Sequence, residues 1–170
     1  MSADGSVRFE RRGAAAYITF DRPAARNAMT WAMYDQLAAA LDRLNADPDI
    51  RVAILRGEGG NFVAGTDIAQ FASFTGAEDG VVYERRLEAV VSQLEAARVP
   101  TVAVIEGHAA GGGLALAAAC DLRLCTPDAR FAVIALHNGR LGKVNRRDAR
   151  RMLRHARRSA LGLGLPRRAL

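Results

Sequence analysis

Apolar residues recur along the first 131 residues with two periods, one typical of strands and one typical of helices. Residues 15–21, Ala-Ala-Tyr-Ile-Thr-Phe-Asp, are predicted to form a strand that ends at an Asp-Arg-Pro turn. A helix is predicted to begin after Thr30, a good N-cap residue, and to stop near the Ala-Asp-Pro sequence at 46–48. Its apolar stripe has helical spacing and consists of Tyr34, Leu37, Ala38, Leu41 and Leu44.

Two short, continuous apolar runs, at 52–55 and 101–105, are typical of strands that are buried on both faces of a sheet. Between them, residues 61–68 form a loop that is expected to open a short helix. A second long helix is expected to end before Pro100. Its apolar stripe consists of Tyr83, Leu87, Val90, Val91 and Leu94.

A glycine-rich turn at 107–113 follows the second apolar run. It is expected to lead into a helix of small residues at 114–120, followed by short strands at 121–125 and 130–131. This alternation of strands and helices predicts βαβ units, and therefore an α/β fold with a mainly parallel sheet. Strand patterning is lost after residue 131.

The composition is that of one globular domain, because half of the 170 residues are hydrophobic and a quarter are charged. Disordered and fibrous chains are excluded. The N-terminus lacks the apolar core of a signal peptide, and the longest apolar stretch, 109–120, is too short to span a membrane. Cys120 and Cys125 lack a partner pattern and are expected to be reduced thiols, with no metal site. We therefore expect a soluble, cytoplasmic protein.

The charge divides the chain into two parts. Residues 1–131 carry 13 Arg against 17 Asp and Glu, a net charge of −4, whereas residues 132–170 carry 10 Arg and one Lys against Asp148 alone, a net charge of +10. We therefore predict a core at 1–131 and an Arg-rich tail, helical or irregular, at 132–170.

The glycine-rich turn at 107–113 does not match two familiar phosphate-binding motifs. Leu114 stands where a Walker loop has lysine, and the consecutive glycines do not match a dinucleotide-binding fingerprint. A helix N-terminus remains, with the N–H of Gly112 as a suitable donor. The loop at 64–67 also opens a helix, and two N–H donors that converge from two helix starts form an oxyanion hole. On spacing alone, two ordinary strand-to-helix turns explain the pattern equally well.

Five separated motifs occur in order and resemble the crotonase superfamily, the enoyl-CoA hydratase/isomerase proteins, over about residues 7–131. They are Asp21-Arg-Pro with Arg26-Asn-Ala, Phe62-Val-Ala-Gly-Thr-Asp-Ile, the segment 100–113, Ala119-Cys-Asp-Leu-Arg and Ala129-Arg-Phe. The resemblance implies a ββα spiral fold, here truncated. It also implies an acyl-CoA thioester as the substrate, no separate cofactor, and a role in fatty-acid or related acyl-CoA metabolism.

The resemblance also assigns the site residues. The backbone N–H groups of Thr66 and Gly112 are expected to hold the thioester oxygen and to stabilise the enolate. Arg26 is expected near the phosphates of CoA. The loop that cups the adenine end is expected to include Ala64, Asp67 and Ile68.

The chain departs from this family at both acids that hydratases use. One glutamate is replaced by Ala115 and the other by Ala135. Hydration needs groups that position and deprotonate a water molecule, and neither Glu106 nor His108 is expected to replace them. Activity is therefore expected to be impaired. Self-association into trimers or hexamers, as in the family, is doubtful for a truncated chain.

The tail leaves alternatives open. Of residues 132–170, 28 are Ala, Arg, Gly, Leu or Pro, which is typical of GC-rich DNA read out of frame. Residues 146–161, taken as a helix, instead carry seven arginines around one apolar face, as in helices that bind nucleic acid or membranes. No aromatic residue interleaves these arginines, so nucleic-acid binding is not expected. The candidate functions are an acyl-CoA enzyme, an inactive relative that binds CoA, and a protein that acts through its basic tail.

Overall fold

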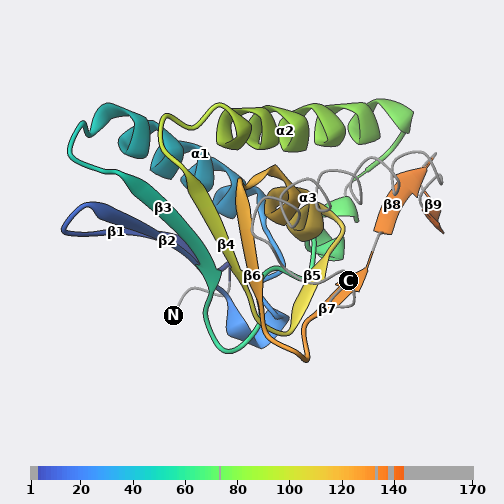
Figure 1. Ribbon diagram of the computed structural model, residues 1–170. Helices are drawn as coiled ribbons and strands as arrows, with labels where there is room; N and C mark the ends of the chain where they lie inside the picture. Colours follow the sequence, from blue (N-terminus) through green and yellow to red (C-terminus); the bar gives the residue numbers. More distant parts are fainter. Residues whose placement is uncertain (1–3, 73, 133, 138–139, 144–170) are drawn as a thin grey trace.

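The computed structural model describes residues 4–72, 74–132, 134–137 and 140–143 (Figure 1). Its main sheet has five strands in the order β1-β2-β3-β4-β6. β1 and β2 are antiparallel, and the other neighbouring pairs are parallel. The strands are β1 (Ser6–Arg12), β2 (Ala15–Asp21), β3 (Val52–Gly57), β4 (Thr101–Ile105) and β6 (Leu122–Cys125). This confirms the expected α/β class with a mainly parallel sheet.

Within the described residues, three α-helices accompany the sheet, and α1 and α2 lie over one of its faces (Figure 1). α1 packs against β1 and β2, and α2 packs against both α1 and α3. The α-helices are α1 (Trp31–Ala46), α2 (Ala77–Glu95) and α3 (Gly112–Ala119), and two short 3-10 helices are η1 (Pro23–Ala25) and η2 (Ile68–Phe71). All three predicted α-helices are present, with ends that differ from the expected ones by a few residues.

Local sequence explains where α1 begins. The side chain of Thr30 accepts a hydrogen bond of 3.3 Å from the backbone N–H of Met33, which satisfies one of the free donors at the helix start. The predicted stripe faces inward, since Tyr34, Leu37 and Leu41 are each at most 1% exposed. Burial of this stripe, rather than helix propensity, provides most of the helix stability.

The core lies between the sheet and α1. A row of inward residues crosses three strands, because Ile18 pairs with Leu55 and Leu55 pairs with Ala103, and all three are fully buried. On the opposite face, Ile54 and Val102 are only half-buried. The prediction that β3 and β4 are buried on both faces is therefore wrong: continuous apolar runs occur here although only one face is fully covered.

A smaller parallel pair, β5 (His108–Ala110) and β7 (Arg130–Ala132), lies beside α3. The bridge between Val63 and Ala109 joins the loop after β3 to this pair. As a result, the segments that carry the 62–68 motif and the glycine-rich motif come together.

Several strands were not predicted from the hydrophobic pattern of the sequence. β1 and β5 were not predicted, and β8 (Ile134–His137) pairs with β9 (Arg140–Lys143) in a region where strand patterning was expected to be lost. Backbone pairing forms these strands although their side-chain alternation is weak or short. The rest of the tail, 144–170, with the helix predicted at 146–161, lies outside the described residues.

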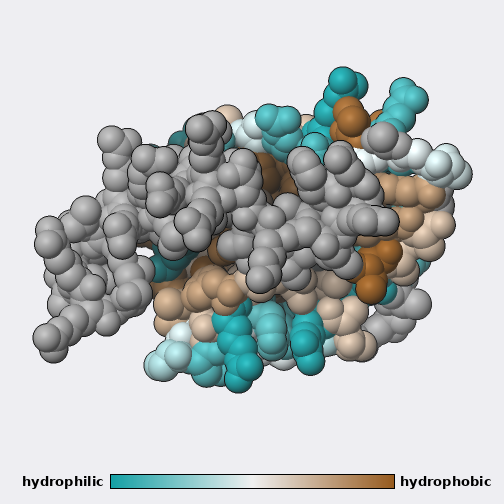
Figure 2. All heavy atoms as spheres, turned by 90° about the vertical axis from the view of Figure 1, so that its right-hand side faces the viewer, coloured by the Kyte–Doolittle hydropathy of each residue, from teal (hydrophilic) through white to brown (hydrophobic). Residues whose placement is uncertain are grey.

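Figure 2 shows that apolar side chains form a band across the middle of the face on the right of Figure 1, with hydrophilic side chains along its lower edge. The large hydrophobic residues exposed in the described part of the chain are Ile68, Val81, Val82, Leu124 and Phe131. Among the helices that the structure describes, none combines the length and apolar character needed to cross a membrane.

Candidate active site

Two strand-to-helix loops lie directly against each other. The N–H of Val63 donates to the carbonyl of His108 (3.1 Å), and the N–H of Ala110 donates to the carbonyl of Val63 (3.0 Å). A Cβ atom on Gly113 would lie 2.1 Å from the carbonyl oxygen of Val63, so only glycine allows this close approach. The two loops are thus held as one unit by their backbones.

This unit brings Thr66 and Gly112, the residues of the two predicted N–H donors, together. A Cβ atom on Gly112 would lie 3.4 Å from Oγ1 of Thr66. Gly65, with φ +112°, turns the chain immediately before Thr66, and Gly112 is the first residue of α3. Within the described part of the chain, neither the N–H of Thr66 nor that of Gly112 donates a hydrogen bond. Both donors are therefore available to an external acceptor.

Three hydroxyl groups meet beside these donors. Oγ1 of Thr66 lies 2.7 Å from the hydroxyl oxygen of Tyr34 on α1 and 3.1 Å from that of Tyr83 on α2. We call Tyr34, Thr66 and Tyr83 the hydroxyl cluster. Burial raises the pKa of both tyrosines, so they are neutral hydrogen-bonding groups.

Tyr34 and Tyr83 are predicted from the sequence only as members of apolar helix stripes. The signal that could have suggested more is the phenol itself, because a buried tyrosine hydroxyl needs a hydrogen-bond partner. The sequence contains three tyrosines, and two of them stand in otherwise aliphatic stripes. Which partner they share depends on how α1, α2 and the 62–68 loop cross.

Two aromatic rings pack against Tyr83 of the hydroxyl cluster. The ring of Tyr83 lies 5.0 Å from that of Phe71 and 5.7 Å from that of Trp31. Arg86 stacks on Trp31, with its guanidinium carbon 5.4 Å from the ring centroid, and forms an ion pair with Asp35. These contacts between η2, α1 and α2 hold Tyr83 in place.

The residues expected to contact CoA lie on adjoining segments. The N–H of Ala64 donates to the carbonyl of Arg26 (3.1 Å), and the side chain of Arg26 is exposed. Ile68 is 71% exposed, which is unusual for a large apolar residue. The structure thus joins Ala64 to Arg26 and leaves the side chains of Arg26 and Ile68 exposed.

The side chain of Asp67 stabilises this loop through hydrogen bonds to Ala69 and Arg22. Its Oδ1 accepts from the N–H of Ala69 (3.0 Å) at the start of η2, and its Oδ2 accepts from the guanidinium of Arg22 (2.7 Å). Both side chains of the ion pair are less than 20% exposed. Burial acts to raise the pKa of Asp67, but the bonds from Ala69 and Arg22 outweigh it and hold the pKa below the usual 3.8. Asp67 therefore caps the start of η2 and ties it to Arg22.

We expect Asp67→Asn to lower the melting temperature near pH 7. The native pKa is below the unfolded one, so the stabilisation by Asp67 is complete above the unfolded pKa near 3.8 and is lost as pH falls through the native pKa. The difference in melting temperature between variant and wild type should therefore shrink on acidification. Asp49→Asn, at a carboxylate that is 71% exposed, is the control and should change little. A deficit of Asp67→Asn that is independent of pH would contradict this assignment.

No acid replaces the two missing glutamates within the described residues. Ala115 is half-buried on α3, and Ala135 lies in β8. Glu106 is exposed at the end of β4, while Nδ1 of His108 lies 2.9 Å from Oδ1 of Asn61. No carboxylate of the described part is hydrogen-bonded to the hydroxyl cluster. The described residues also bring together no group of three His, Cys, Asp or Glu suited to a metal ion.

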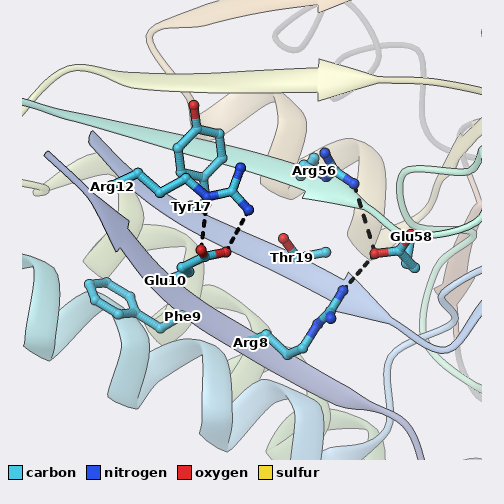
Figure 3. Close-up of a pocket in the computed structure, with 8 residues that line it drawn as sticks. All are labelled: Arg8, Phe9, Glu10, Arg12, Tyr17, Thr19, Arg56 and Glu58. Atoms are coloured by element: carbon cyan, nitrogen blue, oxygen red, sulfur yellow. Dashed lines mark hydrogen bonds and ion pairs between the residues drawn. The ribbon is translucent and has the colours of Figure 1, made fainter. Parts of the chain in front are cut away.

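The structure also contains a hollow of about 570 Å³ away from these residues, on the outer face of β1 to β3 (Figure 3). Its three arginines all pair with its two glutamates: Arg8 lies 2.6 Å and Arg56 3.8 Å from Glu58, and Arg12 lies 2.7 Å from Glu10. The hollow is lined by Arg8, Phe9, Glu10, Arg12, Tyr17, Thr19, Arg56 and Glu58. None of the predicted site residues is among them, and the paired charges leave little net attraction for an anion.

Comparisons with known proteins agree with this architecture. The family model for enoyl-CoA hydratase/isomerase matches residues 10–156, which extends beyond residue 131. A probable enoyl-CoA hydratase of Bacillus subtilis (strain 168) is 36% identical over 124 residues, covering 73% of this chain and 48% of that protein. The mitochondrial enoyl-CoA hydratase domain-containing protein 2 of Bos taurus is 39% identical over 127 residues, covering 74% and 43%.

Solved structures show the same relationship. An enoyl-CoA hydratase/carnithine racemase from Magnetospirillum magneticum has a TM-score of 0.73 at 29% identity, covering 86% of this chain and 66% of that one. Pseudomonas aeruginosa AtuE has a TM-score of 0.71 at 35% identity, covering 75% and 50%. The chain spans about half the length of the curated relatives it matches. With this fold, these motifs and these matches, the chain belongs to the enoyl-CoA hydratase/isomerase family of the crotonase superfamily.

Proposed function

We propose that this chain binds an acyl-CoA thioester and holds its carbonyl oxygen between the backbone N–H groups of Thr66 and Gly112. The observation that carries the proposal is that Thr66 and Gly112 lie side by side, and that neither N–H has an acceptor within the described part of the chain. Donors that are partly shielded from water and lack acceptors are unfavourable, so a site that keeps two of them on neighbouring residues is suited to an acceptor from a ligand.

Such a donor pair favours the enolate over the neutral thioester. When the α-carbon loses or gains a proton, negative charge develops on the thioester oxygen, and two fixed N–H dipoles stabilise that charge without rearranging. The N-terminus of α3 adds a partial positive charge at the same place. The reaction class that this arrangement serves is enolate chemistry on acyl-CoA, in fatty-acid or related acyl-CoA metabolism.

The nucleotide end of the ligand is assigned to the accessible region around Arg26. Its exposed guanidinium is suited to the phosphates of CoA. Ala64 and the exposed side chain of Ile68 supply apolar surface for the adenine, and Asp67 keeps this loop ordered through Ala69 and Arg22.

A second candidate is a CoA-binding protein without hydratase activity. Ala115 favours it, because no carboxylate is available at the position where a hydratase of this family has glutamate. Hydration of crotonyl-CoA requires a base that deprotonates water as it adds to the third carbon and an acid that delivers a proton to the second. The donor pair alone supplies neither group, so this candidate predicts ligand binding without turnover.

The donor pair can be tested with two ligands that differ only in the carbonyl. We expect butyryl-CoA to bind about tenfold more tightly than S-butyl-CoA, a thioether without the carbonyl oxygen, since two hydrogen bonds are lost. Isothermal titration calorimetry measures both dissociation constants. Gly112→Pro removes one N–H donor and should reduce this preference.

Gly112→Ala is the matched control for that variant. A Cβ atom at this position would lie 2.8 Å from the hydroxyl oxygen of Tyr34 in either variant, but alanine keeps the N–H. We expect Gly112→Ala to retain the preference for the thioester even if both ligands bind more weakly. Equal binding of thioester and thioether by the wild-type chain would refute the proposed oxyanion site, and absence of binding by either would refute the proposed function.

A further inference from the structure

We propose that the hydroxyl cluster Tyr34–Thr66–Tyr83 is a specificity device that donates one hydrogen bond to an oxygen substituent on the acyl chain, close to the thioester. This inference rests on the proposed acyl-CoA function and adds a side-chain donor to the two backbone donors. It gives a role to two tyrosines that the oxyanion site does not use.

The hydroxyl cluster contains one more proton than its internal hydrogen bonds use. Three hydroxyl groups carry three protons, and the cluster contains two contacts, from Thr66 to Tyr34 and from Thr66 to Tyr83. Each contact uses one proton, so one O–H remains whichever way the bonds run. Within the described part of the chain, no other hydrogen bond is made by these three hydroxyl groups. The cluster therefore has one donor left for a ligand.

Burial indicates where that donor lies. Tyr34 is 1% exposed, and a deeply buried hydroxyl is most stable when its proton is used inside the protein. Tyr34 therefore donates to Thr66. Thr66 then donates to Tyr83, whose ring is only partly buried, and Tyr83 forms the open end of the cluster. Burial keeps the phenol of Tyr83 protonated by raising its pKa, so it acts as a donor.

The hydroxyl cluster lies close to the proposed position of the acyl chain. Oγ1 and the donating N–H belong to the same residue, Thr66, so a ligand oxygen held at that N–H lies close to the cluster. The hydroxyl of Tyr34 and Oγ1 of Thr66 border Gly112, and Cδ1 of Leu87 borders it at 3.5 Å from the position of a Cβ. The first carbons of an acyl chain thus pass between apolar Leu87 and the hydroxyl cluster. A substituent on the third carbon is only a few bonds from the thioester oxygen and is the group within reach.

The test compares the full chain with butyryl-CoA and 3-hydroxybutyryl-CoA, which differ in one hydroxyl. Trp31 is the only tryptophan and lies 5.7 Å from the ring of Tyr83, so its fluorescence reports binding, with calorimetry as a second readout. We expect the wild-type chain to bind 3-hydroxybutyryl-CoA about tenfold more tightly, a typical effect of one hydrogen bond that is made well.

Four variants separate recognition from a purely structural role. Tyr83→Phe removes the donating hydroxyl and should bring the ratio of the two dissociation constants close to one. Thr66→Val keeps the backbone N–H but removes the bond that orients the hydroxyl of Tyr83, and should lower the ratio. Thr66→Ser keeps the hydroxyl and should preserve the ratio. The matched control is Tyr17→Phe, because Tyr17 is the third tyrosine and contacts Arg12 on the outer face of the sheet.

The possible results test the role of the hydroxyl cluster and the proposed acyl-CoA binding separately. A ratio near one in the wild-type chain, or an unchanged ratio in both Thr66→Val and Tyr83→Phe, overturns the inference while leaving acyl-CoA binding intact. Failure of both ligands to bind overturns the proposed function and the inference with it. If the cluster had only a structural role, disrupting it would lower the affinity for both ligands equally. The ratio of the two dissociation constants would then not change.

Discussion

Asn27→Ala is expected to lower the free energy of unfolding by about 4 kcal/mol. Asn27 is fully buried, and its amide binds three backbone groups, one in its own segment and two in the loop after β3. Its Oδ1 accepts from the N–H of Arg22 (2.8 Å), while its Nδ2 donates to the carbonyls of Glu58 (2.8 Å) and Asn61 (2.7 Å). Alanine would leave three backbone groups without these partners.

Backbone conformation adds to this cost. Asn27 has φ +58°, in the left-handed region, where asparagine is tolerated better than alanine. Urea unfolding followed by circular dichroism measures the loss. Asn45→Ala is the control, because Asn45 accepts a single bond from the N–H of Arg98 (3.0 Å) at the surface. That variant should lose about 1 kcal/mol or less. If both substitutions cost the same, Asn27 does not connect these segments as described.

The position of Asn27 also explains why the Arg26-Asn-Ala motif accompanies the two loop motifs. The segment around it is joined to the 62–68 loop by further backbone bonds, from the N–H of Ala64 to the carbonyl of Arg26 and from the N–H of Met29 to the carbonyl of Gly65. We therefore infer that Asn27 acts on the site indirectly, by holding the loop that carries Thr66.

Ala115→Glu is expected to raise the rate of crotonyl-CoA hydration about a hundredfold, because general acid–base catalysis contributes about that factor or more. Ala115 lies three residues after Gly112 on α3, and residues at this spacing share one face of a helix. A carboxylate there could deprotonate the water that adds to the third carbon. Loss of the enoyl-thioester absorbance measures the rate.

Ala115→Gln is the control, since glutamine has nearly the same size but cannot accept the proton from water. A rate that rises equally in both variants would show that side-chain volume, and not proton transfer, is responsible. A rate that stays at the wild-type level in Ala115→Glu, while butyryl-CoA still binds, would show that the absence of this acid does not limit hydration.

The candidate site was only partly predictable. The glycine pattern at 107–113 and the 62–68 motif predicted two loops with free N–H groups, because glycine at such turns is a local requirement that can be recognised in the sequence. On spacing alone, however, a functional site and a pair of simple turns were equally compatible. The resemblance to the crotonase family selected the first, and the structure then placed Thr66 and Gly112 side by side.

The sequence by itself determined α1 and the central strands. Thr30 and the spacing of the apolar stripe act within a few residues of each other, so the start and the buried face of α1 could be predicted, as could β2, β3 and β4 from their apolar runs. β1 was missed because it is an edge strand with a largely polar outer face, and its stability comes from pairing with β2.

Only the tertiary structure decided the hydroxyl cluster and the contacts of Asn27. Tyr34 and Thr66 are 32 residues apart, and Thr66 and Tyr83 are 17 apart, so their hydrogen bonds depend on how two helices and a loop cross. Asn27 likewise meets carbonyl groups more than 30 residues away. Periodicity shows which face of a helix is buried, but it cannot show which distant hydroxyl or carbonyl a polar group on that face will meet.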